Sequence, residues 1–321
     1  KEPRIVYRFF SVNFYDEEKL YVNSDGAKIE QTWPYINIFR ILTAIDPQKG
    51  FLQRMFSDGG KEGWEIFERI KFKETIEEES ETLGKILDKG ESFKDPGYYD
   101  VIIDGEISGL ISHEACGHPF EADRILGREA AQGGESYVNV DMLKKEKIGS
   151  DVLTIIDNPL LEKASGFYVY DEEGVPARPK YLIKDGIINE FLLNREYASL
   201  LGLKSNGSAR VAYYFNEPLI RMSNTYIEPK DYKFEELVEG ISKGIYFKSY
   251  MEWNIDDRRW NQKYGGLECY LIENGEIKKP LRNVKLEITT GTLFKNIDAV
   301  GKDMKYSTGS CGKGEPMQGV P

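Results

Sequence analysis

The sequence is poor in the features that mark disulfide-stabilised, membrane-spanning or nucleic-acid-binding proteins. Cysteine occurs only at Cys116, Cys269 and Cys311, an odd number at wide spacings that predicts free thiols and a reducing compartment. No run of about 18 apolar residues is present, so we expect no membrane partner. No secretory signal is visible either.

Basic residues are also in the minority. Lys and Arg number 43 against 54 Asp and Glu, a net charge of -11, and they form no stripe of the kind that binds phosphates. This balance argues against a nucleic-acid partner. Hydrophobic residues make up 40% of 321 positions, which is enough for a folded chain of two domains.

The periodicity of the first 95 residues predicts an antiparallel sheet followed by helices. Residues 4–14 and 19–22 are rich in β-branched and aromatic residues, and Asp25-Gly26 is a hairpin signal. Residues 62–89 have helical spacing, and the acidic run within 77–81 suits a solvated helix face. The breakers at 94–97 predict the boundary between domains 1–95 and 96–321.

The second domain is predicted to be β-rich, which makes the fold class α+β. We expect a strand at 99–103 and a helix from about Ser108. A β-rich region should follow over 152–228. The remaining expectations are hairpins at Asp185-Gly186 and Asn274-Gly275, helices at 195–201 and 233–247, a last strand at 284–289 and a loop at 308–321.

The two histidines of the chain stand five residues apart, at His113 and His118, and Glu114 follows the first. Neutral imidazole is a good ligand for Zn²⁺, and zinc lowers the pKa of a coordinated water to about 7. A neighbouring carboxylate can then take the proton and pass it to a leaving amine. The pattern therefore predicts a zinc-dependent hydrolase with Glu114 as the general base.

The spacing of five requires a distorted helix. Five residues of a regular α-helix turn through about 500°, which leaves the two side chains about 140° apart. Gly117 is permissive and Pro119 disfavours the α conformation at His118. We therefore expect a π-bulge, or the end of the helix, between residues 117 and 119.

Five segments resemble, in the same order, motifs of the TldD/PmbA family of peptidases. The first, residues 112–118 (SHEACGH), is similar to the HExxxH segment of its TldD branch. The others are residues 171–177 (DEEGVPA), 221–226 (RMSNTY), 296–301 (NIDAVG) and 309–314 (GSCGKG) with 318–321 (QGVP). The sequence departs from the family pattern at Pro119 and at the insertion 315–317. The resemblance covers residues 95–321 well.

The resemblance implies one Zn²⁺ per chain and cleavage of unfolded or short peptides in the cytoplasm. It also implies a homodimer, or a heterodimer with a PmbA-like paralogue. By carry-over, His113, His118 and Cys311 are the metal ligands and Glu114 is the base. Cys311 suits the role as a soft thiolate near glycines. Glu121 and Cys116 remain rivals for the third ligand.

Substrate contacts and other functions are less sharply predicted. Asn224, Thr225, Arg210 and Arg221 are candidates for holding a substrate backbone or its oxyanion. A β-rich domain could also bind a peptide as an added strand. Two alternatives to the zinc peptidase are a metal-independent cysteine hydrolase using Cys311 and a non-catalytic, zinc-stabilised interaction subunit.

Overall fold

The N-terminal layer is an antiparallel sheet of three long strands, β1 (Ile5–Val22), β2 (Lys28–Asp46) and β3 (Gly50–Gly60), in that order. The computed structural model describes residues 2–130 and 134–321. Residues 4–14 and 19–22, expected as separate strands, belong to the single strand β1, because pairing with β2 continues without a break to Val22. The predicted hairpin turn is confirmed, with Gly26 at φ +89°.

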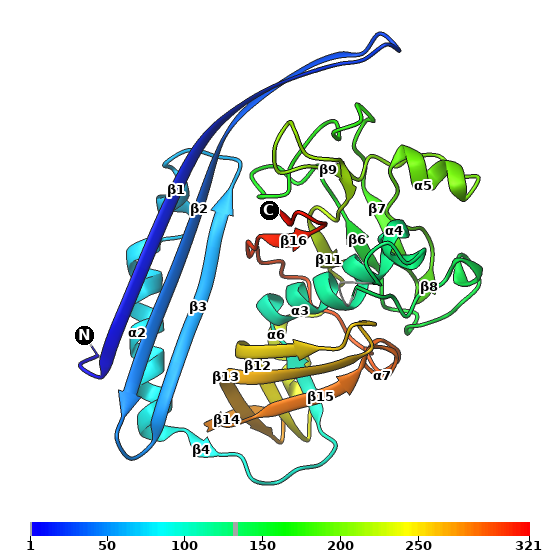
Figure 1. Cartoon of the computed structure of the whole chain (residues 1–321). Helices are drawn as coiled ribbons and strands as arrows, with labels where there is room; N and C mark the ends of the chain where they lie inside the picture. The colour runs from blue at the N-terminus through cyan, green and yellow to red at the C-terminus, as the bar shows by residue number, and fades with distance from the viewer. Residues whose placement is uncertain (1, 131–133) are drawn as a thin grey trace.

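The hairpin of β1 and β2 extends beyond the sheet as an arm. β3 pairs with β2 only from Ile36 to Asp46, so the rest of the hairpin is a two-stranded ribbon that arches over the C-terminal body (Figure 1). The Lys19 ammonium donates to Glu172 Oε1 at 2.5 Å and the Tyr21 hydroxyl to the Glu173 carbonyl at 3.0 Å. The arm therefore contacts the 171–177 motif.

Helices α1 (Ile66–Arg69) and α2 (Phe72–Lys89) follow the sheet, and α2 packs on one of its faces (Figure 1). Leu83, Ile86 and Leu87 of α2 are buried against apolar side chains of the sheet. The expectation that the acidic run is wholly solvated is wrong for Glu79. Its carboxylate binds Arg40 and Arg54 of the sheet at 2.9 and 3.2 Å, because buried guanidinium groups need a charged partner.

The C-terminal body is built on a mixed sheet in the order β4-β14-β13-β12-β5, with β15 also paired to β13. Its hairpin turn at Asn274-Gly275 has both residues at positive φ, as a two-residue turn requires. β5 runs parallel to β12 and leads into the helix of the site. The bounds are β4 (Glu91–Ser92), β5 (Asp100–Ile103), β12 (Lys243–Ile255), β13 (Asn261–Glu273), β14 (Glu276–Arg282) and β15 (Lys285–Thr289).

Short strands complete the body around helix α3 (Gly105–Ile111), which is buried at Ile107 and Ile111. One sheet has the order β11-β6-β7-β8, and the predicted turn at Asp185-Gly186 joins its last two strands. The other elements are β6 (Ile155–Asp157), β7 (Lys180–Lys184), β8 (Ile187–Ile188), β9 (Ala209–Arg210), β10 (Leu219–Ile220), β11 (Thr225–Ile227), β16 (Cys311–Lys313), β17 (Gln318–Val320), α4 (Ala122–Ile125), α5 (Arg195–Leu200), α6 (Phe234–Glu239) and α7 (Thr290–Lys295).

The α+β class is confirmed, while several element boundaries differ from expectation. The helix predicted over 233–247 ends at Glu239, and β12 begins at Lys243, because Gly240 and Gly244 interrupt it and the residues that follow pair with β5. Residues 152–228 hold short strands and helix α5, joined by irregular segments. The expected loop at 308–321 contains the hairpin β16–β17, and the insertion 315–317 forms its turn.

The expected helix near Ser108 starts three residues earlier, at Gly105. The domain division at residue 95 stays a prediction. Residues 94–97 carry no helix or strand, while β4 just before them pairs with β14 of the C-terminal sheet. Across residues 2–130 and 134–321, no helix is both long and apolar enough to cross a bilayer.

Candidate metal centre

The two histidines are brought together by a change of helix type. α3 continues as a π-helix over Ser112–Gly117 and then as a 3₁₀ turn over His118–Phe120. The His118 N–H donates to the His113 carbonyl. A hydrogen bond between residues five positions apart defines a π-helix. The imidazole rings consequently lie 4.6 Å apart between centroids, at 90° to each other. The predicted helix distortion is confirmed.

Gly117 is required by packing at this distortion. A Cβ atom there would lie 2.3 Å from Met222 Sδ, far inside contact distance. Met222 belongs to the 221–226 motif, so a side chain of this segment packs directly on the backbone of the π-helix. A side chain at position 117 would require Met222 to move.

Cys311 reaches the histidines from β16, at the far end of the chain. Its Sγ lies 3.2 Å from His118 Nε2, and the ligand atoms of His113, His118 and Cys311 all lie within 4.8 Å of one another. Burial raises the pKa of this thiol, but hydrogen bonds to the two histidines outweigh that effect and lower it to about 5. The sulfur is therefore a thiolate at neutral pH.

These three donors fit a zinc ion. Zn–N distances of about 2.0 Å and Zn–S distances of about 2.3 Å place tetrahedral ligand atoms about 3.5 Å apart, close to the separation of Cys311 from His118. Imidazole and thiolate are both zinc ligands, and catalytic zinc sites use three protein ligands. Within the described residues, no fourth His, Cys, Asp or Glu joins this cluster.

The two rival ligands lie elsewhere. Cys116 is fully buried in the hydrophobic core, where burial raises the pKa of its thiol well above the ordinary value. Glu121 faces the other ring nitrogen of His118, with Oε2 3.4 Å from Nδ1. A carboxylate on that nitrogen typically orients a histidine ligand from behind.

A buried ion cluster that sequence reasoning missed holds Glu121. Lys313 Nζ is fully enclosed and donates to Glu121 Oε2 at 3.0 Å, Asp123 Oδ1 at 2.7 Å and the Ile220 carbonyl at 2.9 Å. Although burial raises the pKa of Glu121, the charges of Lys313 and His118 hold it well below its ordinary value. Lys313 stands two residues after Cys311, so strand alternation could have placed both side chains on one face.

Glu114 lies beside the histidines and is largely buried. Its Oε2 accepts a hydrogen bond from Arg259 Nη1 at 2.6 Å. Burial raises the pKa of the carboxyl, yet the charges of the histidines and Arg259, with a hydrogen bond from Trp253, lower it overall. The carboxylate is therefore charged and able to accept a proton. Sequence reasoning did not single out Arg259 or Trp253.

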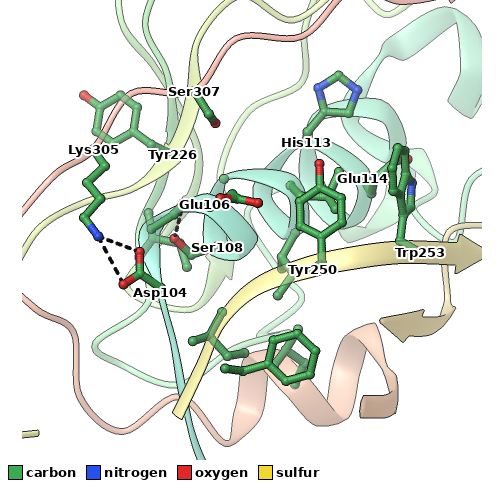
Figure 2. A pocket seen from close by; sticks show the side chains of 18 of the residues that line it. Asp104, Glu106, Ser108, His113, Glu114, Tyr226, Tyr250, Trp253, Lys305 and Ser307 are labelled. Carbon is green, nitrogen blue, oxygen red and sulfur yellow. Dashed lines mark hydrogen bonds and ion pairs between the residues drawn. The ribbon is translucent and has the colours of Figure 1, made fainter. Parts of the chain in front are cut away.

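A cavity of about 3080 Å³ opens in front of this group, between β3 and the C-terminal body. Figure 2 shows Tyr250 and Trp253 projecting from β12 beside Glu114, and the ion pair of Asp104 with Lys305 at another part of the wall. Its lining includes residues of β12 together with His113, Glu114 and Cys311.

The four predicted substrate contacts also line the cavity, and three of them are hydrogen-bonded within the protein. Nε and Nη1 of Arg221 are buried without a hydrogen-bond partner among the described residues. Asn224 binds backbone groups of Gly166 and Asn158, at 3.1 and 2.8 Å, and the Thr225 hydroxyl lies 3.3 Å from Asp157. Arg210 donates to the Met222 carbonyl at 2.7 Å, and Arg221 lies 3.4 Å from Glu121. Their role toward substrate stays a prediction.

Residues 96–316 match the family described as "PmbA/TldA metallopeptidase C-terminal domain". A metalloprotease of Methanothermobacter thermautotrophicus is 34% identical over 94% of this chain and 64% of its own length. The zinc metalloprotease TldD homolog of Saccharolobus solfataricus is 38% identical over 69% of this chain and 48% of its own.

The fold is shared with a Thermotoga maritima crystal structure described as a candidate modulator of a DNA gyrase. It superposes with a TM-score of 0.77 at 20% identity, over 95% of this chain and 66% of the other. The chain spans less than two thirds of the length of the curated metalloproteases that match most of it. The profile match and the sequence relatives place this chain in the TldD/PmbA family of metallopeptidases.

Proposed function

We propose that this protein is a zinc-dependent peptidase that hydrolyses peptide bonds of unfolded or short peptides. The observation that carries the proposal is the convergence of His113, His118 and Cys311, with the Glu114 carboxylate on the same helix. His113, His118 and Cys311 would hold one Zn²⁺ per chain. The name of one relative, a zinc metalloprotease, supports this choice of metal.

Zinc held by these residues would polarise the scissile carbonyl and make water nucleophilic at neutral pH. Glu114 accepts one proton from the attacking water on a carboxylate oxygen and delivers it to the nitrogen of the leaving amine. One C–O bond forms and the C–N bond breaks. Glu121 and Lys313 keep the His118 ring oriented during the reaction.

A metal-independent cysteine hydrolase is the second candidate, favoured by the short contact between Cys311 Sγ and His118 Nε2. Chelation separates the two mechanisms. We expect a strong chelator to abolish cleavage of an internally quenched, unstructured peptide, and about one equivalent of Zn²⁺ per chain to restore it. Full cleavage by chelated, metal-free protein would contradict the zinc mechanism and support a cysteine hydrolase.

We further propose that the peptide binds as an added strand on β12. β5 pairs only with residues 244–247 of β12, and among the described residues no other strand pairs with that edge over 248–255. Tyr250 and Trp253 of this segment line the cavity beside Glu114. Backbone pairing would give binding with little sequence preference, as expected for unfolded substrates.

Backbone methylation of the substrate tests strand addition. Only alternate N–H groups of an added strand face its partner, so an N-methyl group at one such amide should lower kcat/KM by about tenfold or more. Methylation of the next amide, which faces away, serves as the control. Equal effects at neighbouring amides, or a steep preference for one side chain next to the cut, would contradict the proposal.

The partner and the location follow from the family and remain proposals. We propose a dimer, either of two copies of this chain or with a PmbA-like paralogue, acting in the cytoplasm. The three cysteines are unpaired, which supports a reducing compartment. Mass measurement of the purified assembly, alone and with such a paralogue, tests the partner.

A further inference from the structure

The turn between β12 and β13 is fixed by several hydrogen bonds. The Asp256 carboxylate accepts from the N–H groups of Trp260 and Asn261, at 2.7 and 3.1 Å, and its carbonyl accepts from Arg259 N–H at 2.9 Å. Thr290, at the start of α7, binds the Arg259 carbonyl at 2.7 Å through its hydroxyl. The backbone at Arg259 is therefore held from both sides.

Arg259 occupies this turn in a conformation that favours glycine. Its φ is +63°, in the left-handed region that a side chain makes unfavourable. Its Nε–H is buried and has no hydrogen-bond partner in the part of the chain that the structure describes. Both features cost stability locally, and such costs concentrate at functional positions.

The side chain of Arg259 is directed at the proposed general base. Nη1 lies 2.6 Å from Glu114 Oε2, although 145 residues separate the two in sequence. Trp253, on the β12 side of the same hairpin, lies beside Glu114 in the lining of the cavity (Figure 2). The β12–β13 hairpin thus contacts the carboxylate through Arg259.

We propose that Arg259 is a positioning residue that fixes the orientation of the Glu114 carboxylate for proton transfer. This inference rests on the proposed function, since it gives Arg259 a role only through Glu114. A carboxylate is free to rotate about its last side-chain bond, and a hydrogen bond to one oxygen removes that freedom. The left-handed backbone conformation of Arg259 then directs its guanidinium group toward Glu114 and lowers local stability.

The test compares Arg259→Met, Arg259→Lys and Arg259→Gly in the zinc-loaded protein, with the internally quenched peptide as substrate. Methionine should lower kcat by about 10- to 100-fold, with KM and zinc content nearly unchanged. Lysine, which keeps the charge, should recover part of the loss. Glycine should lower kcat equally while the melting temperature stays the same or rises, since it relieves the left-handed strain.

Arg258→Met is the matched control, because Arg258 is the preceding residue, is 64% exposed at its side chain and lies 3.8 Å from Glu135. It should leave kcat unchanged. Adding Arg259→Met to Glu114→Gln should cause no further loss, since the two residues act as one unit. An unchanged kcat in Arg259→Met, or loss of zinc there, would overturn the inference. Full turnover by Glu114→Gln alone would instead overturn the proposed function.

Discussion

Glu114→Gln is expected to lower kcat by about 10²- to 10⁴-fold, the range that a general acid–base group contributes. The amide has the size of the carboxylate and can still accept a hydrogen bond from Arg259, so the surroundings should keep their structure. It cannot take a proton from water at neutral pH, and the leaving amine loses its proton donor. The measurement is kcat on the internally quenched peptide.

Zinc content decides how that loss is interpreted. None of the three proposed ligand atoms is altered, so Glu114→Gln should retain about one zinc per chain. Glu276→Gln is the control, because Glu276 is exposed on β14 and its carboxylate pairs with the nearby Lys278. A glutamine variant with wild-type kcat would remove Glu114 from the mechanism. An inactive variant that has lost its zinc would give Glu114 a structural role instead.

Local chemistry explains why the centre of the site could be predicted from sequence. His113 and His118 are five residues apart, and the geometry of a helix demands a distortion between them that Gly117 and Pro119 permit. The structure contains that distortion as a π-helix. Cys311 is different, because its identification depended on the family resemblance, and the structure brings it to the histidines.

The supporting residues could not be predicted because their partners are distant in sequence. Arg259 contacts Glu114 across 145 residues and Lys313 contacts Glu121 across 192. Each is an ordinary charged residue in a chain where 30% of residues are charged, and only the folded hairpins show which charge is buried. The prediction of a solvated helix face was wrong at Glu79 for the same reason, since its partners Arg40 and Arg54 lie on strands of the N-terminal sheet, distant in sequence.

Contacts between segments distant in sequence also limited the prediction of helices and strands. Hairpin turns at Asp25-Gly26, Asp185-Gly186 and Asn274-Gly275 were predictable, because Gly, Asn and Asp tolerate the positive φ that each of these turns contains. The segment 233–247 was not, because its second part is drawn into a sheet by pairing with β5, which precedes it by more than a hundred residues. Tertiary pairing overrides local helix propensity there.

Cys311→Ala is expected to remove both zinc and peptidase activity. Loss of a residue that merely orients a ligand weakens metal binding by about 10- to 100-fold, so loss of the thiolate itself should exceed about 100-fold. The remaining histidines offer two donors, fewer than a catalytic zinc site uses. Metal content after gel filtration and kcat on the quenched peptide, measured on the same preparation, test this expectation.

Two cysteine controls make the result specific. Cys269→Ala alters a buried core thiol on β13 and should keep zinc and activity at some cost in stability, while Cys116→Ala tests the rival beside the histidines. If Cys311→Ala kept its zinc and Cys116→Ala lost it, the third ligand would lie on the π-helix. If Cys311→Ala kept zinc but lost turnover, the sulfur would act on the substrate. Because Cys311 Sγ lies 3.2 Å from His118 Nε2, we expect that, of the three variants, only Cys311→Ala loses both zinc and turnover.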